Sequence, residues 1–73
     1  MKKIVFIKSL QKILEKKISE KDNLEKKGLD SLKVLELMVF NDKNFKNINI
    51  NPDKISKCKK VSDLIRLYGK EIN

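Results

Sequence analysis

The stretch that decides the fold is GLDSLKVLELMVF, residues 28–40. A glycine and an Asp-Ser pair precede a run whose apolar residues recur at helical spacing. Asp30 is a good N-cap, because its carboxylate can accept from the backbone N–H of Leu32 or Lys33 and complements the positive end of the helix dipole. The stretch therefore predicts a helix that begins at Ser31 and ends within Asn41–Asn44.

This helix has two unequal sides. One side is expected to line the interior and carries Val34, Leu37, Met38, Phe40 and Asn41. The other side carries Leu32, Leu35, Glu36 and Val39. Its apolar residues have two interpretations, since they can belong to the core or form a surface that meets a partner.

Upstream of the stretch, an amphipathic helix is predicted from about Lys3 to Lys17. Its apolar stripe consists of Ile4, Ile7, Leu10, Leu14 and Ile18, widened by Phe6 and Ile13. From Ser19 to Leu29 the helical period disappears, so this segment is expected to be a surface loop pinned by Leu24 and Leu29.

Downstream, Pro52 suits the first position of a short helix that has Asn51 as its cap, with Ile55 and Cys58 pointing inward. A last helix takes Val61, Leu64, Ile65 and Tyr68 and ends at Gly69 in a left-handed conformation. No strand pattern of any length is present. The prediction is an all-α bundle of three main helices and one short helix, with a long first loop, in a single domain over residues 1–73.

Composition narrows the possible chemistry. The 73 residues include one cysteine and no histidine, which excludes an internal disulfide and leaves no plausible zinc ligand set. A chain this short rarely has room for an enclosed active site, so we expect no catalytic residues and no metal. Residues 1–7 imitate a signal peptide, but Lys8 and Ser9 break the apolar run. We expect a cytoplasmic protein with no membrane span.

The formal net charge is +8, and its distribution is uneven. The charge is +5 over residues 1–29 (9 Lys, 4 acids), −1 over 30–44 (2 Lys, 3 acids) and +4 over 45–73 (6 Lys, 1 Arg, 3 acids). A basic cluster of Lys54, Lys57, Lys59 and Lys60 could bind phosphates of nucleic acid or of coenzyme A. More often such a cluster is a solvated face. No aromatic residues are interleaved with it and helix-turn-helix spacing is missing, so nucleic acid is not expected as a partner.

Several landmarks, in order, resemble those of the acyl carrier protein family, which includes peptidyl carrier domains. The resemblance covers about residues 4–70. It rests on Leu24-x3-Gly28-Leu29-Asp30-Ser31-Leu32, Glu36-Leu37, Phe45, Ile50-x-Pro52-Asp53 and Val61-x2-Leu64-Ile65. The Asp-Ser-Leu triplet alone is weak, and the agreement of the flanking landmarks gives it weight.

The resemblance implies a carrier and not an enzyme. A phosphopantetheinyl transferase would attach the 4′-phosphopantetheine arm of coenzyme A to Ser31, and Asp30 would cap the helix and help to position the transferase. The arm's thiol would carry fatty acyl or related groups, or as a second choice aminoacyl groups, between acyl-loading and acyl-processing enzymes. Leu32, Leu35, Glu36 and Val39 would form the docking face of a monomer. Family members are typically acidic, so a lysine-rich chain implies dedicated partners with less basic or even acidic docking surfaces.

The residues themselves agree with this chemistry. A serine in the first helical turn keeps its hydroxyl exposed if Asp30 takes over the capping, and a phosphodiester there would sit at a helix N-terminus, which favours an anion. Gly28 would let the incoming loop turn tightly and leave room for a transferase. The alternative is that Asp30 and Ser31 form an ordinary cap in an unmodified basic module that binds nucleic acid or an anionic surface.

Overall fold

A computed structural model describes all residues, 1–73. It contains four α-helices and a short 3₁₀ turn, namely α1 (Lys3–Leu14), α2 (Ser31–Asn44), α3 (Pro52–Ser56), α4 (Val61–Tyr68) and η1 (Gly69–Glu71). The only β-type pairing is an isolated bridge between Asn23 and Lys60. The predicted all-α architecture, with three main helices and a short one, is therefore confirmed.

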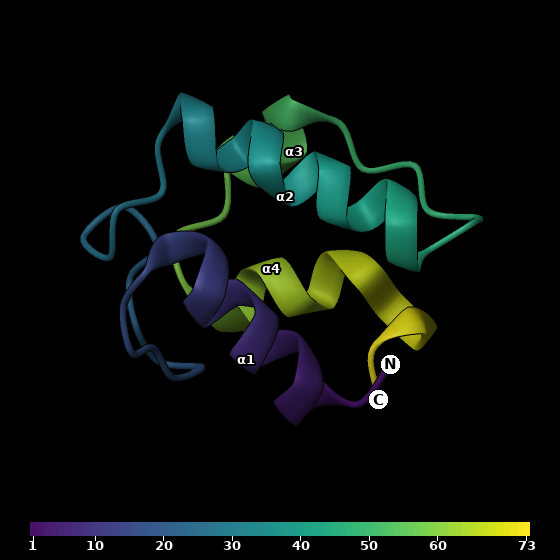
Figure 1. Ribbon diagram of the computed structural model, residues 1–73, viewed down its shortest axis with the longest axis horizontal. Helices are drawn as coiled ribbons and strands as arrows, with labels where there is room; N and C mark the ends of the chain where they lie inside the picture. The colour runs from purple at the N-terminus through teal and green to yellow at the C-terminus, as the bar shows by residue number, and fades with distance from the viewer.

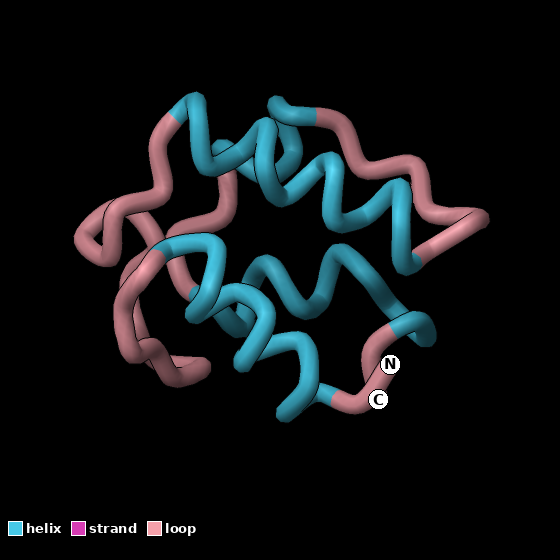
Figure 2. Tube along the Cα trace, in the orientation of Figure 1, coloured by secondary structure: helices cyan, strands magenta, loops and turns pink.

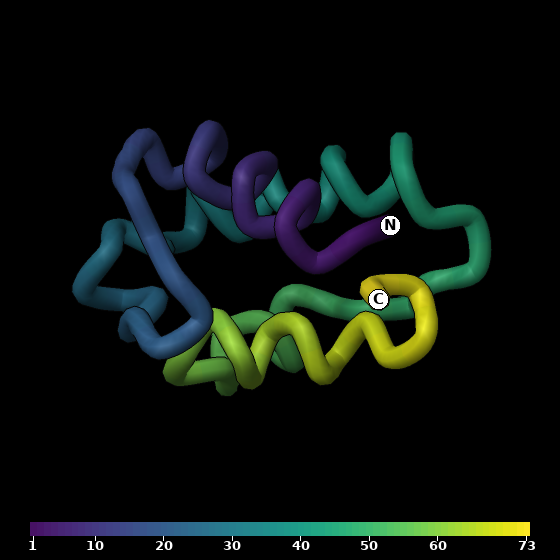
Figure 3. Tube along the Cα trace, turned by 90° about the horizontal axis from the view of Figure 1, so that it is seen from below, coloured from purple at the N-terminus to yellow at the C-terminus, as the bar shows by residue number.

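The helices form two layers. α1 and α2 lie side by side in one layer, and α3 and α4 make up the other (Figures 1 and 3). The two chain ends meet, because the Asn73 amide donates to the Met1 carbonyl at 2.8 Å and the Lys3 amide donates to the Asn73 carbonyl at 2.8 Å. The terminal ammonium also donates to the Glu71 carbonyl at 2.7 Å. None of the helices combines the length and the hydrophobicity that a membrane crossing requires.

A single apolar cluster fills the space between the layers. Its fourteen buried members are Phe6, Leu10, Leu14, Ile18, Leu24, Val34, Leu37, Phe45, Ile50, Ile55, Val61, Leu64, Tyr68 and Ile72. The four aromatic rings, which are spread along the sequence, gather at one end of this core. The Tyr68 ring lies 4.8 Å from that of Phe6 and 5.1 Å from that of Phe45, measured between ring centroids.

The first helix is shorter than predicted. It ends at Leu14, because Glu15 takes a left-handed conformation (φ 58°). The backbone amide of the next residue, Lys16, then donates a hydrogen bond to the Gln11 carbonyl at 3.2 Å. The predicted extension to Lys17 is therefore wrong, although Ile18 is buried after the chain turns. Ile4 was placed on the apolar stripe but is 62% exposed, and Phe6 fills the core instead.

The loop between α1 and α2 (Figure 2) is held by backbone hydrogen bonds in addition to the predicted apolar contacts of Leu24 and Leu29. Its backbone pairs with the start of α4, where the Leu24 amide donates to the Lys59 carbonyl at 2.8 Å and the Val61 amide donates to the Asp22 carbonyl at 3.0 Å. Ile18 adds a third apolar anchor, and it is buried like Leu24, while Leu29 is only half-buried. The loop is thus a fixed wall beside the start of α2.

The two C-terminal helices begin as their sequences indicate. The Asn51 side chain accepts from the Lys54 amide at 2.9 Å, ahead of Pro52. Asp63 accepts from the backbone amides of Lys60 and Lys59 at the start of α4, and these bonds hold the pKa of its carboxyl below the usual value.

Gly69 ends α4 at the predicted place. Its φ is positive (55°), but its ψ of −127° lies outside the predicted left-handed helical region. The chain continues from there into η1, which brings Ile72 back into the core.

Candidate functional site

Asp30 caps α2 as predicted. Its backbone is extended, and its Oδ1 accepts from the Lys33 amide at 2.9 Å while its carbonyl accepts from the Val34 amide at 2.9 Å. The carboxylate therefore satisfies one of the donors that a helix leaves open at its start and complements the positive end of the dipole.

Ser31 is the first residue of α2 and is exposed. Because Asp30 does the capping, the Ser31 hydroxyl forms no hydrogen bond within the protein. The loop enters the helix through Gly28, whose φ of 99° is rarely adopted by other residues. A Cβ at Gly28 would meet nothing closer than the Lys16 Nζ at 3.7 Å, so the backbone conformation, not the available space, requires glycine.

A pocket of about 750 Å³ opens beside Ser31. Three segments wall it: the fixed loop, the first turns of α2, and the stretch from α3 to the start of α4. The lining residues are Asn23, Glu25, Leu29, Asp30, Ser31, Val34, Leu35, Pro52, Ser56, Lys57, Cys58 and Lys59. Its volume falls within the range typical of small-molecule sites.

Only part of this pocket is predictable from the sequence. Asp30, Ser31 and Leu35 are predicted site residues, whereas nothing in the sequence relates the basic cluster to the serine. Of the cluster, Lys57 and Lys59 line the pocket, whereas Lys54 and Lys60 do not. Asn23 and Ser56 carried no recognisable signal, because their contribution depends on how the loop folds against the start of α4.

The side of α2 that carries Leu32, Leu35, Glu36 and Val39 faces away from the core. Leu32, Leu35 and Val39 are 63%, 58% and 53% exposed, so the interpretation as core residues is wrong. On the opposite side, Val34 and Leu37 are buried, while Met38 and Phe40 are partly buried against the core. Exposed apolar residues in a row on one helix are suited to contact with another molecule.

Glu36, the acidic member of this face, is exposed and forms an ion pair with Lys33. The Lys33 ammonium lies 3.5 Å from the carboxylate of Glu36 and 3.4 Å from that of Glu15, the residue that follows α1. Partial desolvation acts to lower the pKa of Lys33, but the charges of Glu36 and Glu15 outweigh it and raise that pKa. The face therefore presents apolar residues beside an exposed carboxylate that shares one ammonium group with Glu15.

The sequence predicts Cys58 on the inner face of the bundle, whereas the structure places it on the pocket wall. It is partly buried, and its thiol donates to the Lys54 carbonyl with an S···O distance of 3.4 Å. Burial raises the pKa of the thiol, and the nearby charge of Asp63 raises it further. A raised pKa disfavours the thiolate, which agrees with the prediction that Cys58 is an inert cysteine.

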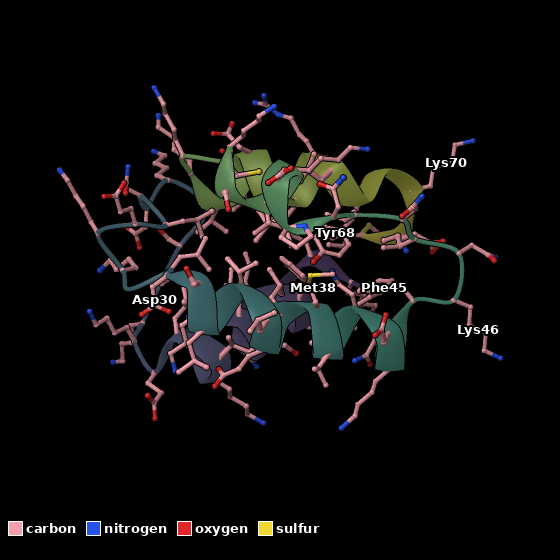
Figure 4. The ribbon with its side chains drawn as sticks, turned by 90° about the horizontal axis from the view of Figure 1, so that it is seen from above. Asp30, Met38, Phe45, Lys46, Tyr68 and Lys70 are labelled. Carbon is pink, nitrogen blue, oxygen red and sulfur yellow. The ribbon has the colours of Figure 1, made fainter.

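Near its C-terminal end, α2 packs into the core, and we call this the closed end. Asn41 is 5% exposed, and its Oδ1 accepts from the Tyr68 hydroxyl at 2.6 Å. Its Nδ2 atom is buried without a hydrogen-bond partner. Figure 4 shows Tyr68, Phe45 and Met38 gathered between the two layers. Burial strongly raises the pKa of the Tyr68 hydroxyl, although the hydrogen bond to Asn41 opposes this.

Comparisons with known proteins add no assignment. No family model matches the chain, and neither the comparison with curated proteins nor that with solved structures found a match.

Proposed function

We propose that this chain is an acyl-carrier-like bundle, modified on Ser31 by a 4′-phosphopantetheine arm that holds intermediates as thioesters. The observation that carries the proposal is the Ser31 hydroxyl, because this residue is exposed, its hydroxyl forms no hydrogen bond, and it lines a pocket of about 750 Å³. The resemblance of the sequence around it to carrier proteins supports the same assignment.

The chemistry of attachment suits this position. The Ser31 oxygen would attack the phosphorus next to the pantetheine in coenzyme A, breaking the pyrophosphate P–O bond so that 3′,5′-ADP leaves. The hydroxyl proton would pass to a base of the transferase. The resulting phosphodiester would lie against the start of α2, where the dipole favours an anion.

The chain would act as a carrier and supply no catalytic residue. The thioester chemistry would take place on the arm's thiol within partner enzymes, which load and process the acyl group. Fatty acyl or related groups are the first choice of cargo and aminoacyl groups the second. The row of Leu32, Leu35 and Val39, with Glu36, would dock these enzymes.

The test is covalent loading. The purified protein is incubated with coenzyme A and a broad-specificity phosphopantetheinyl transferase, and its intact mass is measured. We expect one added arm in the wild-type protein and none in Ser31→Ala. The matched control is Ser56→Ala, which removes another hydroxyl from the same pocket and should still load. Failure to load with several transferases would overturn the proposal.

A second function is supported by the charge. Of the 18 lysine and arginine side chains, only Lys3, Lys33 and Arg66 take part in ion pairs. An unmodified module with so many unpaired cations would bind nucleic acid or an anionic membrane through them. Binding to either would fall steeply as salt is added, and absence of binding at low salt would exclude this function.

A further inference from the structure

Two lysines share the pocket with Ser31. Lys57 and Lys59 line the same pocket as the serine, and neither is paired with a carboxylate in the structure. Their backbone atoms are engaged, since the Lys59 carbonyl accepts from Leu24 and the Lys57 amide donates to Asp53 at 3.2 Å. The two ammonium groups are thus carried by an ordered backbone and left without a partner.

Two carboxylates also line the pocket, so its formal side-chain charges balance. Glu25 and Asp30 are the acidic members of its lining. The Asp30 carboxylate is turned onto the Lys33 amide, so its charge is directed at the helix start. The backbone amides of Ser31 and Leu32, which precede Lys33, donate to no group in the protein. The apolar lining comes from Leu29, Val34 and Leu35.

We propose that this pocket is a binding site for a phosphate ester, contacted by the side-chain ammonium groups of Lys57 and Lys59. Lysine binds phosphate as a compact point charge with three donors, and two lysines on one wall suit a group with several acceptor oxygens. The apolar residues would contact the organic part of the ester. No covalent step is involved.

The phosphate ester can come from two sources, and both of them depend on the proposed carrier function. One is the phosphodiester of an arm already attached to Ser31, which the lysines would draw into the pocket. The other is a phosphate of coenzyme A as it approaches the unmodified protein. The site itself requires neither, because it exists before any modification.

The first experiment uses the unmodified protein. Its backbone amide NMR signals are followed during titration with 3′,5′-ADP, and with adenosine as the matched ligand that lacks phosphate. We expect saturable shifts at Ser31, Leu32, Lys57 and Lys59 with the nucleotide and none with adenosine. No saturable shift in this region, or equal shifts with adenosine, would overturn the proposal.

Variants then locate the charges responsible. Lys57→Ala and Lys59→Ala should each raise the dissociation constant about 3- to 5-fold, the effect expected of one exposed ion pair. Glu25→Gln should lower it about twofold, because it removes an opposing charge from the same pocket. The control is Lys46→Ala, an exposed lysine at the opposite end of the molecule from Asp30 (Figure 4). An equal loss in Lys46→Ala would indicate bulk charge alone and would overturn the proposal.

The second experiment assigns the source. If the protein loaded on Ser31 binds 3′,5′-ADP at least about fivefold more weakly than the unmodified protein, the arm's own phosphate occupies the site. Equal binding by both forms assigns the site to the incoming coenzyme A. If Ser31 cannot be loaded at all, the proposed function fails, while the titration of the unmodified protein still decides whether the phosphate site exists.

Discussion

The two ends of α2 are built in opposite ways. At its start, Asp30 and Ser31 are exposed, and the serine hydroxyl has no partner beside an open pocket. Near its end, Asn41 is buried and hydrogen-bonded to Tyr68, and the Phe45 ring packs 5.1 Å from the tyrosine ring. In Figure 4, Asp30 lies at the edge of the molecule, whereas Met38, Phe45 and Tyr68 lie between the two layers.

The difference separates core packing at one end of the helix from exposed side chains at the other. A chain of 73 residues buries a small core and has little stability to lose. The closed end contains the aromatic contacts, so it should account for much of that stability. The open end contributes a cap and little packing, so its side chains are available to bind or to be modified.

The largest expected effect is at the closed end. Phe45→Ala removes a buried ring that contacts Tyr68 and should lower the free energy of unfolding by about 3 kcal/mol. Leu32→Ala at the open end truncates a side chain that is 63% exposed and should change it by less than about 0.5 kcal/mol. Urea denaturation followed by circular dichroism measures both.

Phe45→Ala can leave too little folded protein to measure, so Phe45→Leu provides a milder step. It should cost about 1 kcal/mol, still more than Leu32→Ala. Equal losses from Phe45→Leu and Leu32→Ala would contradict the division of α2 into two ends.

The buried Asn41–Tyr68 pair gives the next largest effect. Tyr68→Phe keeps the ring but leaves both polar atoms of the Asn41 side chain without partners, which should cost about 1 to 2 kcal/mol. Adding Asn41→Leu removes the stranded amide, so the double variant should recover most of the loss. A double variant as unstable as Tyr68→Phe would show that packing and not polar pairing dominates there.

Most of the fold could be predicted because it depends on local patterns. Helical spacing located α2 and α4, Asp30 and Asn51 marked helix starts, and Gly69 marked an end. The predicted first helix is too long because the spacing from Leu14 to Ile18 continues the apolar helical stripe. The left-handed turn at Glu15 ends the helix, and no glycine or proline in the sequence marks this turn.

The candidate site was predictable only in its local part. The helix cap and the exposure of Ser31 follow from local sequence, since Asp30 and the amide that it accepts from, that of Lys33, are only three residues apart. The pocket does not, because its walls come from a loop and an α3–α4 connection that meet through backbone pairing of Leu24 with Lys59. Backbone pairing of this kind leaves no side-chain pattern, so only the structure shows that Lys57 and Lys59 line the same pocket as the serine.

The pairing of Asn41 with Tyr68 also lay beyond the sequence. Asn41 was recognised as a polar residue on the inner side of α2, and Tyr68 as an inward residue of α4. They are 27 positions apart, and nothing in either segment indicates that the two polar groups meet. A buried polar pair is a matter of tertiary register, which periodicity does not encode.

The cap sets a smaller effect at the open end. Asp30→Ala removes the acceptor for the Lys33 amide and should lower the free energy of unfolding by about 1 kcal/mol. Asp30→Asn retains an acceptor and should lose only a few tenths of that. Thermal unfolding of the three proteins compares them. A loss in Asp30→Ala as large as in Phe45→Ala would show that the start of α2 is structural in the same way as its end.

The least disruptive test of the closed end is a titration of the intact protein. Tyr68 is the only tyrosine in the chain, so absorbance at 295 nm reports its ionisation alone. Burial raises its pKa above the ordinary value of 10.0, and the folded protein should therefore titrate at higher pH than the same protein in concentrated urea. Coinciding titrations in the two states would show that the tyrosine is accessible to water and that this end of α2 is not closed.

The same shift makes stability depend on pH, and its sign follows from proton binding. Above pH 10 the unfolded chain releases the Tyr68 proton while the folded chain retains it, so the unfolded state binds fewer protons. The Tyr68 contribution to stability is therefore complete below pH 10 and declines as the pH rises toward the folded-state pKa. Tyr68→Phe lacks this group, so its free energy of unfolding should fall less steeply between pH 9 and pH 11 than that of the wild type. Because the lysines titrate in both proteins, the difference between the two slopes isolates the tyrosine, and equal slopes would place its hydroxyl in water.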